Sequence, residues 1–222
     1  MTSRTVSAVG RSSRFVAAAA ALSVVLTVSA CGERTDSAQP ISGMTVHNDD
    51  GMNGAVLTEQ YVMPDVSLTA TDGSSYSLTK DTAEPLTLVF FGYTHCQDIC
   101  AAVMSDIASA MTRLDESDRE QVEMLFVTTD PTRDDPRVLR EYLDRFDPSF
   151  EGVTGELAKI VEAGDALGVA IERGAKLPSG GYAVAHGTQI VAIDEADRAP
   201  IVWTEGTSAD DLAEDITELL NT

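Results

Sequence analysis

Basic residues, aromatic residues and cysteines are all scarce in this chain of 222 residues. It has 15 Lys and Arg against 36 Asp and Glu, which gives a formal net charge of −21. Because phosphate contacts need a basic surface, this balance excludes a DNA- or RNA-binding role. Three cysteines are too few for a disulfide-rich scaffold. Hydrophobic residues still make up 43% of the chain, so we expect a folded domain with a buried core.

The apolar run near the N-terminus, residues 15–28, is shorter than the roughly 20 residues that a membrane-spanning helix needs. It follows three arginines, so residues 1–30 have the pattern of a secretory signal peptide. Residues 28–31 (VSAC) resemble a bacterial lipobox, which predicts cleavage before Cys31 and lipidation of its thiol. The alternative is ordinary signal cleavage that leaves a free cysteine. We expect a lipid-anchored protein on the extracytoplasmic face of the cell membrane.

Residues 31–60 predict a flexible linker between the anchor and the rest of the chain. They are rich in Gly, Ser, Thr, Asp and Asn and contain no long periodic apolar stretch. Met44, His47 and Met52 lie in this segment and could act as soft metal ligands. The favoured interpretation is that they are scattered linker residues.

Residues 61–222 predict a single α/β domain that begins with a hairpin. Residues 66–70 and 76–78 flank a turn at Asp72 and Gly73. Continuous apolar runs at residues 86–91 and 122–128 are typical of central strands that are buried on both faces. Two further strands, at residues 188–193 and 200–203, are expected to pair antiparallel.

Helix signals alternate with these strands. Apolar residues at helical spacing predict a helix over residues 99–114. Asp135 followed by Pro136 predicts the start of a second helix, and Thr154 is expected to cap a third. Residues 207–210 resemble a capping box that opens the last helix. The order of elements indicates a central mixed sheet flanked by helices.

Two cysteines stand where the first buried strand meets the first helix. Cys96 and Cys100 fall in residues 92–100, and a spacing of four places both sulfurs near one face of a helical turn. A helix N-terminus favours the thiolate, which is both the nucleophile and the soft-metal ligand. The pair could therefore close as a redox-active disulfide or chelate one metal ion. Cys100 alone would more simply be a buried hydrophobic residue, but two cysteines in a polar turn favour a functional site.

A metal held by two thiolates needs a further ligand, and the chain has only three histidines. The His95 side chain is expected to point away, because it is adjacent to Cys96. His186 lies in a glycine-bearing loop just before the strand at residues 188–193. If that strand neighbours the one at residues 86–91, His186 lies beside the thiols. Two cysteines and one histidine suit copper as Cu(I) or Cu(II), whereas structural zinc usually takes a fourth protein ligand.

The residues around the cysteines also resemble a known family. Residues 91–100 (FGYTHCQDIC) are similar to the signature of the Sco/SenC family of copper chaperones. The similarity continues in residues 64–73, 127–136 (VTTDPTRDDP), 146–148 (FDP) and 152–155 (GVTG), and it extends over nearly the whole domain.

This resemblance implies a thioredoxin-like fold in a membrane-anchored protein that faces outside the cytoplasm. It implies copper binding through Cys96, Cys100 and His186. The family is implicated in delivering copper to the binuclear copper centre of cytochrome c oxidase, or in keeping the thiols of that centre reduced. The implied partners are the oxidase subunit that carries this centre and a protein that donates copper.

The chain departs from the family pattern on both sides of the expected site. The family commonly has Pro after each cysteine, where this chain has Gln97 and Ala101. It often has Asp before the histidine and Ser after it, where this chain has Ala185 and Gly187. These differences could change the rigidity of the loop and the orientation of His186. Neither removes a ligand.

Three classes of function remain open after this comparison. The first is a copper metallochaperone, which is not an enzyme. The second is an extracytoplasmic thiol–disulfide oxidoreductase that uses Cys96 and Cys100. The third is a lipoprotein that binds partners without a metal. Thioredoxin-type enzymes usually have two residues between their cysteines and a cis-proline beside them. This chain has three residues between its cysteines and no proline just before Thr188, which favours copper.

Overall fold

The computed structural model describes residues 46–47, 51–82, 84–96, 99–176 and 182–221. The chain divides into two units, Met1–Gln39 and Pro40–Thr222, and all described residues belong to the second unit. The expected signal peptide, Cys31 and Met44 therefore lie outside the described residues. None of the helices in the described part of the chain is long and apolar enough to cross a membrane.

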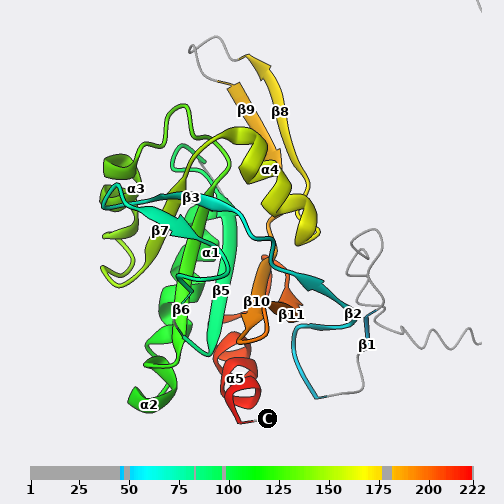
Figure 1. Ribbon diagram of the computed structural model, residues 1–222. Coiled ribbons are helices and arrows are strands. Elements are labelled where there is room, and N and C mark those ends of the chain that lie inside the picture. Colours follow the sequence, from blue (N-terminus) through cyan, green and yellow to red (C-terminus); the bar gives the residue numbers. More distant parts are fainter. Residues whose placement is uncertain (1–45, 48–50, 83, 97–98, 177–181, 222) are drawn as a thin grey trace, which may run out of the picture. The chain divides into compact units, whose positions relative to one another are not determined.

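The centre of the second unit is a nine-stranded mixed sheet (Figure 1). Its strands are β1 (Val46–His47), β2 (Ala55–Val62), β3 (Ser67–Ala70), β4 (Ser75–Ser77), β5 (Leu86–Gly92), β6 (Val122–Thr128), β7 (Glu151–Thr154), β10 (Ile190–Asp194) and β11 (Arg198–Trp203). They lie in the order β1-β2-β11-β10-β5-β6-β7-β3-β4. Two further strands, β8 (Ile171–Lys176) and β9 (Tyr182–His186), form a separate antiparallel pair.

The two apolar runs form the strands that the sequence predicts. β5 pairs parallel with β6, and β10 pairs antiparallel with the other edge of β5. Side chains along β5 alternate between two hydrophobic clusters, with Leu88 and Phe90 in one and Val89 and Phe91 in the other. Because both faces of β5 are covered, every one of its residues is buried. The predicted pairing of residues 188–193 with the first central strand is confirmed.

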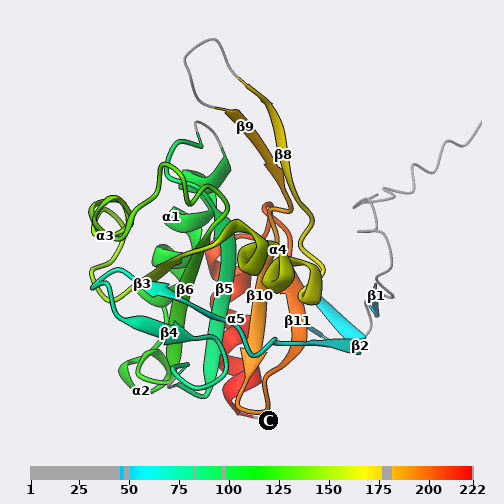
Figure 2. The ribbon, with the colours of Figure 1, turned by 45° about the horizontal axis from the view of Figure 1, so that its top comes forward.

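Helices cover both faces of this sheet. They are α1 (Ile99–Met111), α2 (Glu116–Arg119), α3 (Pro136–Leu143), α4 (Leu157–Ala166) and α5 (Ala209–Leu220). Helices α1, α3 and α5 bury their apolar sides in the same cluster, whereas α4 packs in the other. Figure 2 shows α4 on one side of the sheet and α1 and α5 behind it. The predicted central mixed sheet with flanking helices and an N-terminal hairpin, β3–β4, is confirmed.

Two of the predicted helix caps are correct and one is wrong. The Asp135 carboxylate accepts a hydrogen bond from Val138 N, and Ser208 Oγ caps α5 in the same way. Thr154 does not cap a helix. It ends β7, because residues 151–153 pair parallel with β6, and α4 begins only at Leu157 without a side-chain cap. This four-residue strand is too short to leave a clear apolar pattern.

The structure also differs from the sequence prediction at β2 and β9. The linker was expected to reach residue 60, but β2 already begins at Ala55 and pairs with both β1 and β11. Leu57 is its one buried residue, so its sequence carries little sign of a strand. His186 was expected in a loop, and it instead ends β9. β2 is decided by pairing with the distant β11, and β9 by pairing with its neighbour β8.

Candidate metal centre

The end of β5 and the start of α1 bring the two cysteines together. Cys96 N donates a hydrogen bond to Tyr93 O (3.1 Å), which closes a tight turn after Gly92. Cys100 is the second residue of α1, and its backbone N–H points at Cys96 Sγ (3.5 Å). The Cys96 sulfur therefore lies at the N-terminus of α1, where the helix dipole favours a thiolate. No disulfide joins the two residues.

The two thiols have different surroundings. Cys100 is fully buried and packs in the same cluster as Met104 and Met111, whereas Cys96 is partly exposed. Burial, followed by the hydrogen bond with Cys96, raises the pKa of the Cys100 thiol. Cys96 is thus the sulfur that an incoming group meets first. The interpretation of Cys100 as a buried hydrophobic residue is correct for its packing. It does not explain why His186 lies beside the Cys100 sulfur.

His186 stands directly beside Cys100. Its Nε2 atom lies 3.7 Å from Cys100 Sγ, although the two residues are 86 positions apart in sequence. Its Nδ1 atom lies 2.8 Å from Gly187 O, a contact that assigns the ring proton to Nδ1 and leaves the Nε2 lone pair directed at the sulfur. Burial lowers the pKa of the imidazole, so the neutral form that binds metals is favoured.

The Cys100–His186 pair has the separation that a shared metal ion requires. Metal–sulfur and metal–nitrogen bonds of about 2.3 and 2.0 Å at a tetrahedral angle place the two ligand atoms about 3.5 Å apart. Within the described ranges, no three His, Cys, Asp or Glu side chains form a complete metal-binding cluster. Cys96 is the nearest further thiol, since its sulfur contacts the backbone N–H of Cys100. The protein thus provides a pair of donors with a second thiol beside it.

The other candidate ligands lie elsewhere. His95 is exposed, and its Nδ1 atom lies 3.0 Å from Thr94 Oγ1 and 3.7 Å from an Asp134 oxygen. These contacts direct the ring to Thr94 and Asp134. Met52, which was assigned to the linker, packs against the hydrophobic core. His47 belongs to β1, and its side chain is outside the described residues.

Asp134 is a residue of this site that the sequence prediction missed. Its carboxylate is fully buried and accepts hydrogen bonds from Thr94 N (2.9 Å), Thr94 Oγ1 (2.6 Å) and Thr128 Oγ1 (2.7 Å). These hydrogen bonds join the turn before Cys96, at Thr94, to the end of β6, at Thr128. The family resemblance includes the segment around Asp134, but an acidic chain offers many similar residues, and only the fold shows which one is buried.

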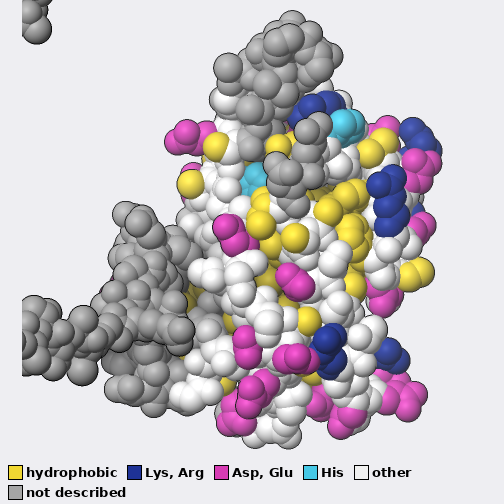
Figure 3. Space-filling model, turned by 180° about the vertical axis from the view of Figure 1, so that it is seen from behind, with side chains coloured by type: hydrophobic (Ala, Val, Ile, Leu, Met, Phe, Trp, Pro, Cys, Tyr) yellow, Lys and Arg dark blue, Asp and Glu magenta, His cyan; other side chains and the backbone are white. Residues whose placement is uncertain are grey.

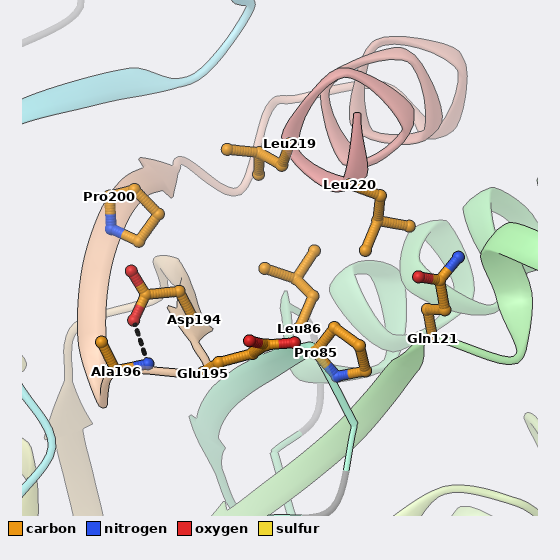
Figure 4. A pocket seen from close by; sticks show the side chains of 9 residues that line it. All are labelled: Pro85, Leu86, Gln121, Asp194, Glu195, Ala196, Pro200, Leu219 and Leu220. Carbon is orange, nitrogen blue, oxygen red and sulfur yellow. Dashed lines mark hydrogen bonds between the residues drawn. The ribbon is translucent and has the colours of Figure 1, made fainter. Parts of the chain in front are cut away.

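The pocket at the opposite end of the sheet is lined by neither thiols nor imidazoles. A cavity of about 480 Å³ opens beside the start of β5, about 20 Å along the strand from Gly92. It is lined by Pro85, Leu86, Gln121, Asp194, Glu195, Ala196, Pro200, Leu219 and Leu220 (Figure 4). None of these residues is a cysteine or a histidine.

Charge is also distributed unevenly over the surface. On the face seen in Figure 3, acidic side chains gather at the end away from the β8–β9 hairpin, and hydrophobic side chains gather in the middle.

Known proteins are similar to this chain over most of its described part. The family model described as SCO1/SenC matches residues 55–221. The copper-bound ScoI of Bradyrhizobium japonicum is 27% identical, with a TM-score of 0.64, over 71% of this chain and 99% of that one. BsSco is 19% identical, with a TM-score of 0.56, over 72% of this chain and 94% of that one. It is described as a member of the Sco family of cytochrome c oxidase assembly proteins in which a disulfide switch was identified.

The match to longer relatives is partial. The mitochondrial protein SCO2 of Saccharomyces cerevisiae is 35% identical over 92 residues, which are 37% of this chain and 31% of the yeast protein. The solved structures confirm that the fold is thioredoxin-like.

Proposed function

Since this chain belongs to the SCO1/SenC family, we propose that Cys96, Cys100 and His186 bind copper and that the protein acts in the assembly of cytochrome c oxidase. The observation that carries this proposal is the 3.7 Å separation between Cys100 Sγ and His186 Nε2. Thiolates hold Cu(I), and imidazole also suits Cu(II), so this donor set fits both oxidation states. The copper-bound ScoI of Bradyrhizobium japonicum supports the assignment.

Copper in this proposal is cargo, and the unequal burial of its ligands suits transfer. Cys100 is fully buried in the hydrophobic core, and the partly buried His186 stands beside it. Cys96 is partly exposed, so a donor or acceptor protein can contact the metal from its side. The protein receives copper from a donor protein and passes it to the oxidase subunit that carries the binuclear copper centre.

Copper titration of the reduced protein tests the metal site. The wild-type protein should bind a single copper ion per chain, and its Cu(II) form should show sulfur-to-copper charge-transfer absorption. Cys96→Ser and Cys100→Ser should each weaken binding and remove the band that their sulfur supplies. His47→Ala should bind as the wild type does, and a loss of copper in this variant would contradict the ligand assignment.

A second candidate function is thiol–disulfide exchange by the same cysteines. It is favoured by the position of Cys96 Sγ, which accepts the Cys100 N–H at the N-terminus of α1. The Cys96 thiolate would attack a partner disulfide, and Cys100 would then displace the partner's sulfur. The partner leaves as a dithiol, and Cys96 and Cys100 remain joined as a disulfide. Because a disulfide blocks both sulfurs as ligands, this reaction and copper binding compete.

Oxidase activity in cells separates these two functions. Thiol exchange needs no imidazole, so a pure reductase predicts normal oxidase in a His186→Ala strain and no oxidase in a Cys96→Ser strain. Copper delivery predicts that both strains fail at limiting copper and that added copper partly restores the His186→Ala strain. Full activity of His186→Ala at limiting copper would replace the metallochaperone proposal by the oxidoreductase one.

We also propose that lipidation of Cys31 holds the protein at the extracytoplasmic face of the cell membrane. The proposal is supported by residues 28–31 (VSAC), which follow a short apolar segment. Metabolic labelling with a radioactive fatty acid should mark the wild-type protein and leave Cys31→Ser unlabelled. Equal labelling of the two proteins would contradict it.

A further inference from the structure

The backbone of His186 is held by β8, since Ile171 is its partner and the next residue, Gly187, donates a hydrogen bond to Ala170 O. His186 ends β9, which pairs only with β8 in the described part of the chain, and this pair is separate from the nine-stranded sheet. Across the site, the imidazole meets two aromatic rings. The Phe90 ring lies 6.5 Å away at 78°, and the Tyr93 ring lies 5.7 Å away at 87°. Both are edge-to-face arrangements, the geometry that aromatic rings prefer.

Of these two rings, Tyr93 is the one that also belongs to the thiol turn. Its carbonyl oxygen accepts a hydrogen bond from the Cys96 N–H (3.1 Å). Phe90 is fully buried within β5, whereas Tyr93 is only partly buried. Tyr93 therefore connects the histidine and the first cysteine at the mouth of the site.

The ring of Tyr93 also has a cation–π contact with Arg133. The Arg133 guanidinium lies 5.9 Å from the centre of the ring, and Arg133 forms an ion pair with the fully buried Asp130. A cation over an aromatic face is attracted by the ring electrons, and a buried anion fixes the cation in place. The loop after β6 thus sets the orientation of Tyr93.

We propose that Tyr93 is a positioning residue for the copper site: its ring holds His186 beside Cys100. This inference rests on the proposed function, and it assigns the effect to the ring of Tyr93 and not to its hydroxyl. Without the ring, the β8–β9 pair is less constrained, and His186 spends less time beside the thiols. Without the hydroxyl alone, the ring remains and His186 stays in place.

Two variants separate these effects, with copper affinity measured by competition with a chelator. Tyr93→Leu should weaken copper binding about two- to tenfold, the value of one aromatic contact. It should also reduce the nitrogen hyperfine signal of the Cu(II) form. Tyr93→Phe keeps the ring, so it should keep both the nitrogen signal and the copper affinity of the wild type. Tyr61→Leu is the control for the loss of an aromatic ring, because Tyr61 packs against the other hydrophobic cluster, and it should keep wild-type affinity.

A double-mutant cycle distinguishes positioning from general support of the fold. Tyr93→Leu should weaken copper binding in the wild-type background and have no further effect in a His186→Ala background. An equal loss in both backgrounds would overturn the proposal, since the ring would then act without the histidine. A Tyr93→Leu variant with wild-type affinity would overturn it as well.

A readout without copper keeps this inference independent of the proposed function. In the metal-free protein, the Tyr93 ring should shift the NMR signals of the His186 ring protons. The shift should persist in Tyr93→Phe and disappear in Tyr93→Leu. A failure of the wild-type protein to bind copper would refute the proposed function alone. Unchanged His186 signals in Tyr93→Leu would refute the positioning role alone.

Discussion

Asp134 and Asp215 are both almost completely buried carboxylates, yet they organise different regions of the molecule. Asp134 accepts hydrogen bonds from Thr94 and Thr128, and so joins the turn before Cys96 to the end of β6. A buried charge is tolerated here because polar hydrogens surround it. The donors of Asp134 all lie next to the candidate metal centre.

The Asp215 carboxylate has equally good partners in another part of the fold. It accepts hydrogen bonds from Asn53 N, Gly54 N (2.8 Å) and Trp203 Nε1 (2.7 Å). These bonds fasten the chain just before β2 to α5 and to the end of β11. A buried, hydrogen-bonded carboxylate therefore holds the turn beside the candidate metal centre in one region. In the other region it joins α5 to the chain before β2 and to β11. We expect loss of Asp215 to affect stability alone, and loss of Asp134 to affect copper binding as well.

The largest effect on stability is expected for Asp215→Ala. Two buried donors, Gly54 N and Trp203 Nε1, and the part-buried Asn53 N lose their acceptor. Each unsatisfied buried group costs about 1–3 kcal/mol, so the free energy of unfolding should fall by about 3 kcal/mol. Urea titration followed by the fluorescence of Trp203, the single tryptophan of the chain, measures this. Glu218→Gln on the exposed side of α5 removes the same charge and should cost little. Equal stability of the two variants would contradict the role of Asp215.

Asp134→Ala should cost about 2 kcal/mol in unfolding free energy and also weaken copper binding by about 10–100-fold. The second effect follows because the Cys96 turn loses its anchor while all three proposed ligands remain. The exposed Asp165→Asn variant serves as the charge control. If Asp134→Ala bound copper as tightly as Asp215→Ala does in its folded form, the distinction between the two carboxylates would be wrong.

Thr94→Val sharpens the comparison by removing one donor from Asp134 and leaving the backbone N–H of residue 94 in place. The expected loss is about 1 kcal/mol of stability, the net value of one hydrogen bond. Copper affinity should fall less than in Asp134→Ala, because the turn keeps its other contact. A larger copper defect in Thr94→Val than in Asp134→Ala would show that the threonine acts by another route.

The smallest effect concerns Glu123, a partly exposed carboxylate that accepts a hydrogen bond from Tyr76 Oη (2.8 Å). Burial, followed by the charge of Glu123, raises the pKa of the Tyr76 phenol above its usual value of about 10. Above about pH 10 the unfolded chain loses a proton that the folded protein keeps, so stability falls as the pH rises.

Tyr76→Phe should remove that part of the alkaline loss and cost about 1 kcal/mol at neutral pH. Urea titrations at a series of pH values measure both effects, with Tyr61→Phe as the control for the loss of a phenol. An unchanged slope above pH 10 in Tyr76→Phe would contradict the assignment.

The parts of the fold that sequence could predict are those with a strong local signal. β5 and β6 are unbroken apolar runs, and α1 has apolar residues at helical spacing. The Asp135 cap was equally clear, because Asp, Pro and an apolar periodicity occur together. β2 and β9 could not be predicted, since their pairing with β11 and β8 determines them rather than their own composition.

The candidate site divides in the same way. Cys96 and Cys100 were proposed from their spacing at the junction of a strand and a helix, and His186 from the scarcity of histidine together with a possible pairing of β10 with β5, which the structure has. Asp134 and Tyr93 were not singled out, because their contacts depend on which side chains meet across loops that are far apart in sequence. Residue types and spacing point to candidate ligands more readily than to the residues that contact them.

The central claim, that Cys96, Cys100 and His186 bind copper together, is tested most directly by copper affinity across four variants. The account predicts that Cys96→Ser, Cys100→Ser and His186→Ala each bind copper about tenfold or more weakly than the wild type. It predicts that His95→Ala, which lacks the exposed histidine next to Cys96, binds as the wild type does. Wild-type affinity in His186→Ala, or a comparable loss in His95→Ala, would contradict it.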